Sequence, residues 1–242
     1  MKYGLISDIH GNLEALEAVF RELDKASVDR IFCLGDVVGY GPNPSECLTL
    51  VRERASVTLA GNHDHAPLGL VDISYFNTYA KRAVEWTASR LSEEEREFLG
   101  NCPLEHKTEV FDIVHSTPLN PSAWEYILSI EDAAENFPAF ESICCFIGHS
   151  HVPVTIMKNE SDHVSVKRIS RVELDRKKKY IINIGSVGQP RDLDPRAAFA
   201  VFDDETLKYE LFRVNYDIGK TQRKILDGGL PRFLAERLAL GQ

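Results

Sequence analysis

Five short polar segments of this 242-residue chain each follow an apolar run that is typical of a buried strand. They hold most of the side chains that could bind a metal: Asp8-Ile9-His10, Gly35-Asp36, Gly61-Asn62-His63-Asp64, His115 and Gly148-His149-Ser150-His151. Strand ends are rigid positions, and several of them can meet at one edge of a sheet. Carboxylate, amide and imidazole groups together suit transition-metal ions in a hydrolytic site. We therefore expect a fold that brings these five segments together.

The bulk composition excludes several other classes of protein. Hydrophobic residues make up 43% of the chain, enough for a substantial core, and the net charge of -9 gives no basic face for duplex nucleic acid. Five cysteines without a CxxC pair argue against a disulfide framework or a zinc knuckle. No signal peptide precedes the first strand and no apolar run approaches the roughly 18 residues of a membrane span, so we expect a cytoplasmic protein.

The order of elements predicts an α/β protein that changes character near its middle. Strands over 2–7, 30–34 and 57–60 alternate with helices, which indicates parallel packing. Helical spacing follows over 75–90, and Ser92 to Glu95 forms a capping-box start. The second half is mainly antiparallel in pattern, with strands over 104–115, 143–148, 153–158, 163–170, 180–185, 197–203 and 207–214. Two helices over 216–227 and 231–240 close the chain, and we expect them to pack on one domain that spans 1–242.

Taken singly, most of the five segments have an ordinary interpretation. Along a strand, Asp8 and His10 would point to the same face and could bind one ion, but a capping Asp and a polar loop His would look the same. Asp36 could place one oxygen on each of two metals or simply end a turn. Asn62 could offer a neutral oxygen or form a turn. The run from Gly148 to Pro153, with two histidines directly after a buried strand, is more specific.

The set as a whole resembles the calcineurin-like metallophosphoesterase superfamily, whose motifs run Asp-x-His, Gly-Asp, Gly-Asn-His-Asp/Glu, His and Gly-His-x-His. Every block is present in that order, and the resemblance extends from residue 4 to about residue 190. Compact microbial members of the phosphodiesterase type look most similar, and the run Asn183 to Ser186 resembles their late Asn-Pro-Gly-Ser turn. The resemblance implies an α/β (α+β) fold, a four-layer αββα sandwich of two mixed β-sheets flanked by helices.

The resemblance also implies roles for the motif residues. One divalent ion would take Asp8, His10, Asp36 and His151, and the other Asp36, Asn62, His115 and His149. The ions would be Mn²⁺ first, with Fe, Zn, Co or Ni as alternatives. Two ions about 3.5–4 Å apart would share Asp36 and a bridging hydroxide that attacks phosphorus. His63 would protonate the leaving oxygen or stabilise the transition state. Asp64 would either orient His63 or cap a helix.

One departure from the family pattern bears on the substrate. The protein Ser/Thr phosphatases and dinucleoside-polyphosphate hydrolases carry Asp-Arg where this chain has Gly39 and Tyr40, so the clamp on a dianionic phosphate is missing. A phosphodiester depends less on that clamp, which favours a phosphodiesterase. Arg191 or Arg196 could supply a substitute cation, or both could be surface arginines.

Two other hypotheses stay open from the sequence. One is a phosphomonoesterase of the protein phosphatase or dinucleoside-polyphosphate hydrolase type, and the other is a non-catalytic metal-binding scaffold, although the scaffold member of this fold lacks the histidine that stands here as His63. The expected partner is a phosphate ester, with nucleotide derivatives among the candidates. We expect no membrane or duplex nucleic-acid partner, and the oligomeric state is open. Substrate choice is expected to lie in loops 65–75 and 117–140.

Overall fold

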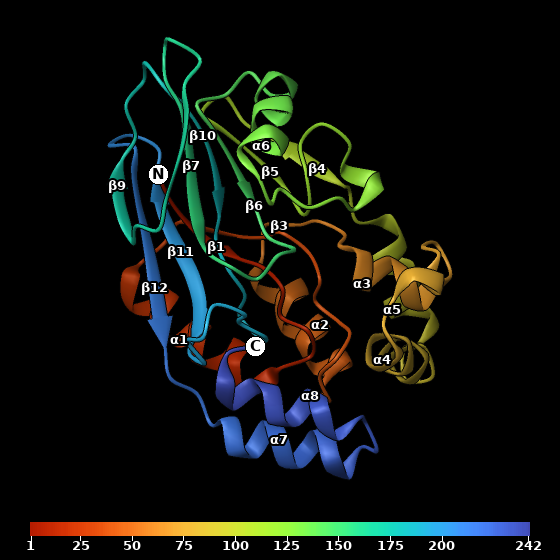
Figure 1. Cartoon of the computed structure of the whole chain (residues 1–242). Helices are drawn as coiled ribbons and strands as arrows, with labels where there is room; N and C mark the ends of the chain where they lie inside the picture. Colours follow the sequence, from red (N-terminus) through yellow and green to blue (C-terminus); the bar gives the residue numbers. More distant parts are fainter.

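The computed structural model describes the whole chain, residues 1–242, as two six-stranded β-sheets packed face to face (Figure 1). The first sheet has the order β3 (Val57–Thr58), β2 (Arg30–Cys33), β1 (Lys2–Ile6), β11 (Ala197–Asp203), β12 (Lys208–Val214), β9 (Arg171–Glu173). The second has the order β4 (Glu105–Lys107), β5 (Phe111–Val114), β6 (Cys144–Ile147), β10 (Lys179–Asn183), β7 (Val154–Lys158), β8 (Val164–Lys167).

Both sheets are mixed, and each has a parallel part that carries the predicted site segments. In the first sheet, β1, β2 and β3 are parallel neighbours; in the second, β5, β6 and β10 are. All other pairs are antiparallel, including the hairpin of β11 and β12. The carboxyl ends of parallel strands leave a sheet at the same edge. The loops after β1, β2, β5 and β6 can therefore meet, as the sequence predicts.

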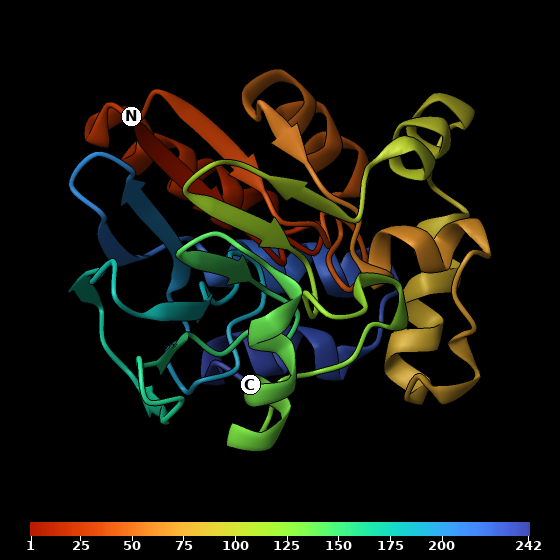
Figure 2. The same ribbon diagram turned by 90° about the horizontal axis from the view of Figure 1, so that it is seen from above.

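Three apolar layers separate four layers of secondary structure (Figure 2). Helices α1 (Leu13–Ala26) and α2 (Pro44–Arg54) pack on the outer face of the first sheet, where Leu16 and Val19 lie in one cluster with Ile6 and Cys33. A second cluster, which includes Phe146, fills the space between the sheets. The third joins the second sheet to α6 (Ile130–Asn136). The predicted sandwich of two mixed sheets flanked by helices is confirmed.

Several elements differ from the sequence prediction. Residues 104–115 form two strands, β4 and β5, with a turn between them, instead of one. The short elements β9, α6 and α3 (Asn62–His65) were not predicted. Helices α4 (Thr78–Ala88) and α5 (Glu93–Asn101) lie where helical spacing placed them, and Ser92 and Glu95 form the expected capping box. The last predicted helix is α8 (Arg232–Glu236) followed by a 3₁₀ turn over Arg237–Leu240.

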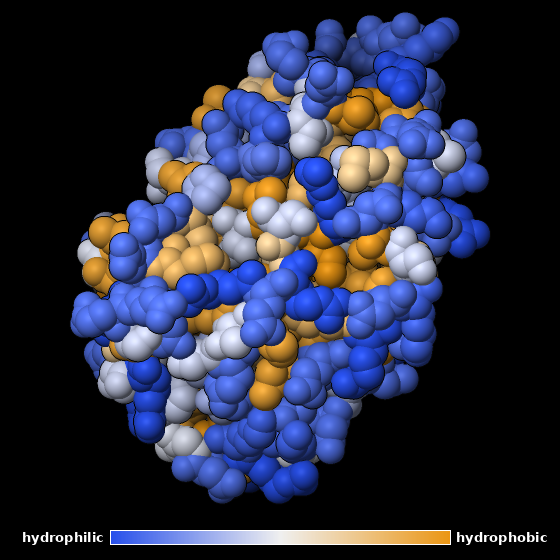
Figure 3. Space-filling model, turned by 180° about the vertical axis from the view of Figure 1, so that it is seen from behind, coloured by the Kyte–Doolittle hydropathy of each residue, from blue (hydrophilic) through white to orange (hydrophobic).

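None of the helices is both long enough and apolar enough to cross a bilayer. The space-filling view of the face turned away in Figure 1 is mostly hydrophilic, with hydrophobic residues exposed around a hollow near its centre (Figure 3).

Helix α7 (Ile218–Asp227) is tied to α1 by a buried carboxylate. Glu14 is only 5% exposed, and its Oε1 lies 3.1 Å from Lys220 Nζ and 2.6 Å from Lys224 Nζ. Thr221 Oγ1 donates a hydrogen bond to Glu14 Oε2 at 3.2 Å. Burial would raise the pKa of Glu14, but Lys224 and Lys220 hold it below its ordinary value.

We expect Glu14→Gln to lower the free energy of unfolding by about 1–3 kcal/mol at neutral pH, because the buried carboxylate loses its charge-assisted contacts to the partly exposed ammonium groups of Lys220 and Lys224. Since the folded-state pKa is below the unfolded value of about 4.5, this contribution is present above that pH and is lost as the pH falls below it. Denaturant unfolding of both forms from pH 3 to 8 measures the difference. Glu17→Gln, an exposed position on the same helix, is the control and should leave stability nearly unchanged.

Candidate metal centre

The five polar segments meet in loops at the carboxyl ends of the strands, and backbone hydrogen bonds hold these loops side by side. The N–H of Asp8 donates to the carbonyl of Gly35 at 3.0 Å, which joins the loops after β1 and β2. The N–H of Gly148 donates to the carbonyl of His115 at 2.9 Å, which joins the loops after β6 and β5. The structure thus brings together all the segments that the sequence singled out.

Left-handed backbone, not strand alternation, aims the site side chains. Strand β1 ends at Ile6, and Asp8 and His10 follow with φ of 54° and 49°. The expectation that these two residues share a face because they lie two apart on a strand is therefore wrong, although both side chains do reach the same place. Four more non-glycine residues of the site have positive φ: Asp36, Tyr40, His149 and His151. This conformation costs energy for residues with a Cβ, and it concentrates at functional sites.

Two motif glycines are required by close packing at the carboxylates. A Cβ on Gly61 would lie 2.0 Å from Asp36 Oδ1, and one on Gly148 would lie 2.5 Å from Asp8 Oδ2 and 2.1 Å from Ser7 Oγ. Neither carboxylate could keep its position beside a larger residue. The glycines of these two motifs are thus explained by sterics.

Each of four buried imidazoles uses one ring nitrogen to bond a backbone carbonyl. The pairs are His10 Nδ1 with Val38 (3.0 Å), His115 Nδ1 with Leu34 (2.9 Å), His149 Nε2 with Trp124 (2.9 Å) and His151 Nδ1 with Gln189 (2.6 Å). A carbonyl only accepts, so the bonded nitrogen carries the proton and the other nitrogen presents a lone pair. Metal-binding histidines are oriented in this way.

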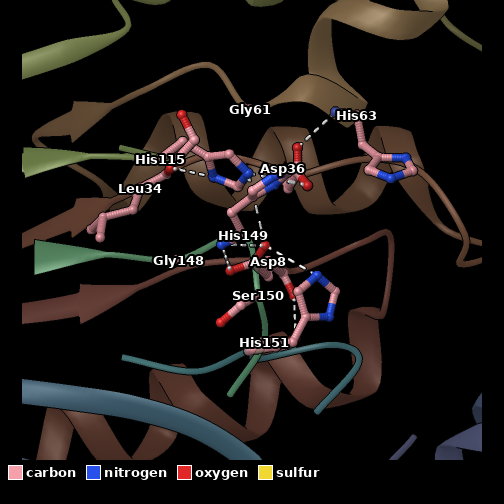
Figure 4. Close-up of polar contacts among 12 residues, drawn as sticks. Asp8, Leu34, Asp36, Gly61, His63, His115, Gly148, His149, Ser150 and His151 are labelled. Atoms are coloured by element: carbon pink, nitrogen blue, oxygen red, sulfur yellow. Dashed lines mark hydrogen bonds and ion pairs between the residues drawn. The ribbon is translucent and has the colours of Figure 1, made fainter. Parts of the chain in front are cut away.

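The free nitrogens point at two carboxylates and form two groups that share Asp36 (Figure 4). The first group is Asp8, His10, Asp36 and His151, and the second is Asp36, His115 and His149; within each, the ligand atoms lie within 4.8 Å of one another. His151 Nε2 lies 3.2 Å from Asp8 Oδ1, and His115 Nε2 lies 3.3 Å from Asp36 Oδ2. The buried Asn62 Oδ1 has no hydrogen-bond partner.

The side chains of the two groups face one another in a way that a bound cation would stabilise and that is unfavourable without one. His10 Nε2 and His151 Nε2 are 3.0 Å apart, and both are the acceptor nitrogens of their rings. Asp36 Oδ2 and His115 Nε2 are also buried without a hydrogen-bond partner. Lone pairs that face one another at this distance repel unless a positive charge lies between them. The nitrogen and oxygen donors are those that Mn²⁺, Fe and Zn²⁺ accept.

The protonation states of three of the four imidazoles agree with this interpretation. Burial lowers the pKa of His10 and His151, and it lowers the pKa of His149 to about 3, so these rings are neutral at pH 7. His115 differs: burial would lower its pKa, but the Asp36 carboxylate raises it to about 9, so this ring holds a second proton at pH 7 that a bound cation would have to displace. Asp8 stays ionised because His151 outweighs the effect of burial on its pKa.

His63 lies beside the cluster and not in it. Its backbone N–H donates to Asp36 Oδ1 at 2.8 Å, whereas its ring lies to one side of the two carboxylates (Figure 4). The ring packs against Tyr40, with centroids 4.3 Å apart, and against Phe76 at 5.2 Å. Burial lowers the pKa of His63 to about 4, and Nδ1 has no hydrogen-bond partner. The ring is therefore neutral and has one N–H to donate.

Asp64 supports backbone and does not orient His63. Its Oδ1 accepts the N–H groups of Val37 and Val38, and its Oδ2 accepts those of Asp36 (2.7 Å) and Gly61 (3.0 Å). Of the two alternatives that the sequence left open, the capping role is the one observed. The orienting role is wrong, because the carboxylate is used up by four amide donors that fix the loop carrying Asp36.

The two candidate arginines differ in position. Arg191 lines a pocket of about 380 Å³ together with Asn62, His63 and His149, and no carboxylate lies within 4.0 Å of its guanidinium. Gln189 Oε1 accepts hydrogen bonds from Arg191 Nε and Nη2. Arg196 is exposed, is paired with Asp194 and does not line this pocket. Of the two candidate arginines, only Arg191 lines this pocket.

Sequence reasoning missed several residues that shape the site. Aromatic side chains line the pocket: Tyr75, Phe76, Trp124 and Tyr126. All but Phe76 lie in loops 65–75 and 117–140, which the sequence analysis named as whole loops without marking these residues. Tyr126 stacks on His149 with ring centroids 4.0 Å apart. Trp124 and Gln189 contribute carbonyls to the histidines. Nothing in their sequence context marks them, because every residue carries a carbonyl.

Comparison with known proteins identifies the family. Residues 1–206 match the family model described as the calcineurin-like phosphoesterase superfamily domain. The chain belongs to this superfamily. It is 40% identical over 244 residues to an uncharacterized protein of Methanocaldococcus jannaschii, covering 98% of this chain and 97% of the relative. The crystal structure of a metallophosphoesterase from Sphaerobacter thermophilus matches with a TM-score of 0.89 and 41% identity over 100% of both chains.

A further solved structure shows how far the fold extends. A hypothetical protein from Pyrococcus horikoshii OT3 is only 20% identical yet superposes with a TM-score of 0.80 over 100% of this chain and 98% of its own. As a calcineurin-like phosphoesterase superfamily member, the chain has a fold that supports hydrolysis of phosphate esters, and its buried Asp and His cluster is compatible with metal binding.

We expect the wild-type chain to bind two Mn²⁺ ions and Asp36→Asn to lose most of both, because Asp36 belongs to both groups. Equilibrium dialysis with elemental analysis measures the occupancy. Saturating Mn²⁺, about 100-fold above the dissociation constant, should also stabilise the wild type by about 2.7 kcal/mol for each bound ion and raise its melting temperature. His163→Ala, an exposed histidine, is the control. Full occupancy in Asp36→Asn would contradict the shared role of this residue.

Proposed function

We propose that this superfamily member is a dinuclear-metal-dependent phosphodiesterase that hydrolyses P–O bonds. The observation that carries the proposal is the set of four imidazoles, each tied to a carbonyl through one nitrogen and aimed at Asp8 or Asp36 through the other. Two ions in this site, Mn²⁺ first among the candidates, would activate water as the nucleophile and neutralise charge on the phosphoryl oxygens. The five free cysteines agree with a location in the reducing cytoplasm, which is part of the proposal.

We propose that each of the two side-chain groups that share Asp36 binds one metal ion. Asp8, His10, Asp36 and His151 would hold one ion; Asp36, His115 and His149, with the unpartnered amide oxygen of Asn62, would hold the other. Asp36 Oδ1 is kept in place by the backbone N–H of His63. Because the four amides on Asp64 fix the same loop, the shared carboxylate has little freedom to move.

His63 is proposed as the catalytic residue that is not a ligand. It lines the pocket between the cluster and solvent, and its neutral ring has one N–H to give. Tyr40 and Phe76 exclude water from the ring on two sides. An N–H presented in a dry site stabilises charge that develops on the leaving oxygen.

A diester substrate is supported by what stands at positions 39 and 40. A Cβ on Gly39 would lie 2.9 Å from His63 Nδ1, and Tyr40 packs on the same ring. The Asp-Arg pair of the monoesterases would have no room in this arrangement. A single guanidinium, Arg191, remains in the pocket. One cation suits the single negative charge of a phosphodiester. The aromatic wall suits a planar ester group, so nucleotide-derived diesters are included in the proposal.

An activity panel tests the proposal against its two alternatives. Purified protein with Mn²⁺ is assayed on an aryl phosphodiester, an aryl phosphomonoester and a dinucleoside polyphosphate. We expect the diester to have the highest kcat/KM. A monoester or dinucleoside preference of tenfold or more would favour the phosphomonoesterase. No turnover of any substrate, with metal occupancy verified, would favour a metal-binding scaffold.

We expect His63→Ala to keep both metal ions and to lose activity by roughly 10²–10⁴-fold, because the ring acts on the leaving oxygen and not on the ions. Elemental analysis and kcat measured on the same preparation separate the two roles. His163→Ala serves again as the control. A parallel loss of metal and rate would show that His63 holds the cluster together and would remove its assigned role.

We expect Arg191→Ala to lower kcat/KM for the diester by about 10- to 100-fold, since one charge-assisted contact to the phosphoryl group is lost. Arg196→Ala, five residues along the same loop but paired with Asp194, is the matched control and should change kcat/KM by less than about twofold. Equal effects of the two substitutions would mean that the pocket position of Arg191 has no part in binding.

A further inference from the structure

A second cavity lies next to the catalytic pocket and differs from it in chemistry. This groove has a volume of about 760 Å³ and runs between the loop before α6 and the strands β7 and β8. Its walls are mostly aliphatic: Ile127, Leu128, Ile130, Val154, Ile156 and Val166. The polar groups that line it include Glu131, Ser129, Ser150 and Arg168.

Aliphatic side chains remain exposed in this groove. Leu128 is 79% exposed, Val166 is 48% exposed and Ile130 is 47% exposed. Single exposed apolar residues are ordinary, but several that face one hollow mark a place where something apolar binds. The residues come from two distant parts of the chain, 127–130 and 154–166, so their meeting is a product of the fold and not of one hydrophobic stretch.

The groove adjoins the catalytic pocket. Tyr126 and Arg191 line both cavities. A void of about 10 Å³, room for about one water, lies beside both and is lined by Tyr126, Ser150, Ile156 and the proposed metal ligand His149. A phosphoryl group held at the cluster would therefore have the aromatic pocket on its His63 side and the groove beyond Tyr126 and Arg191.

The charges at the groove agree with an anionic ligand that carries a hydrocarbon group. Arg191 stands at the shared boundary and Arg168 stands on the groove, and no carboxylate lies within 4.0 Å of either guanidinium. Guanidinium groups beside an aliphatic surface suit a molecule with a phosphate at one end and an apolar chain at the other. The one acidic side chain of the groove, Glu131, does not neutralise them by direct pairing.

We infer that this groove binds the second ester arm of the substrate, and that this arm is an aliphatic chain. The inference rests on the proposed phosphodiesterase function, and it adds the substrate class: a phosphodiester with its leaving group on the His63 side and a hydrocarbon chain on the Tyr126 side. An aryl phosphomonoester has only its leaving group and no second arm, so it would leave the groove empty. The groove thereby adds selectivity for diesters that the phosphate contacts alone do not provide.

A homologous series of substrates tests the inference. Methyl, butyl and octyl esters of 4-nitrophenyl phosphate share one leaving group and differ only in the chain that the groove would hold. Complete burial of one methylene strengthens binding by up to about fourfold, and we expect about twofold in a groove that is open on one side. The octyl ester has seven more methylenes than the methyl ester, so we expect its kcat/KM to be higher by roughly 100-fold. A flat series would overturn the inference while leaving the phosphodiesterase proposal intact.

Substitutions of exposed residues in the groove wall test whether the chain-length preference arises in the groove. Leu128→Gln and Val166→Gln change exposed side chains, so folding is not at risk, and each should remove most of the chain-length preference without lowering kcat/KM for the methyl ester. Leu226→Gln, which removes from α7 a leucine that is 49% exposed and so about as exposed as Val166, is the matched control. A preference that survives both groove substitutions would show that the chain binds elsewhere, and the inference would be wrong.

A binding measurement keeps the inference testable when no diester is turned over. Octyl phosphate and methyl phosphate are titrated into the Mn²⁺-loaded chain by calorimetry. Tighter binding of octyl phosphate, reduced by Leu128→Gln, would support the groove even if the activity panel refutes the phosphodiesterase. Equal affinities would overturn it. Sedimentation of the same samples tests the other occupant: a dimer that Leu128→Gln dissociates, together with a flat ester series, would show that a second copy covers the groove.

Discussion

Backbone carbonyls determine the chemistry of this site, because each one decides which nitrogen of an imidazole is left free. The four carbonyls come from three loops far apart in the sequence: Leu34 and Val38 in the first, Trp124 in the second and Gln189 in the third. If any of these loops moved, its histidine could turn or change tautomer and the lone pair would no longer face the carboxylates. The two sheets matter to function for this reason: they fix the loop ends from which these carbonyls project. The cluster is thus a property of the packed sandwich and not of the ligand side chains alone.

The sequence predicted the layers of the fold and the segments that meet, but not the way they meet. Apolar runs followed by polar residues locate strand ends well, and parallel strands bring those ends to one edge. What the pattern could not show is the left-handed backbone at Asp8, His10 and Asp36. Only glycine adopts that conformation routinely, and aspartate and histidine, although enriched there, adopt it in a minority of cases. Short elements were also missed. Strand β9 has only three residues at a sheet edge, and α6 has seven, too few for a periodic pattern.

Asp64 shows why side-chain identity alone left its role open. An Asp next to the proposed catalytic histidine has the same sequence signature whether it orients that ring or binds backbone. The structure separates the two, since four N–H groups from Gly61 and residues 36–38 occupy its oxygens. These bonds offset part of the cost of the positive φ at Asp36, about 1–2 kcal/mol for a residue with a Cβ. A carboxylate outside the cluster therefore holds the shared carboxylate inside it, and binding of cations would add to the same stabilisation.

The residues at positions 39 and 40, where relatives have Asp-Arg, and the position of the His63 ring depend on each other. With glycine at 39, the ring of His63 approaches the backbone to a distance that a Cβ would prevent, and Tyr40 then covers one face of the ring. Restoring an aspartate and an arginine there would displace the histidine and add a charge that a diester does not need. The remaining cation, Arg191, comes from the loop whose Gln189 carbonyl orients His151, so one loop carries both the support for a proposed metal ligand and the proposed phosphate contact. Since Arg191 also borders the aliphatic groove, the proposed recognition of phosphate and of the second ester arm would be joined at a single residue.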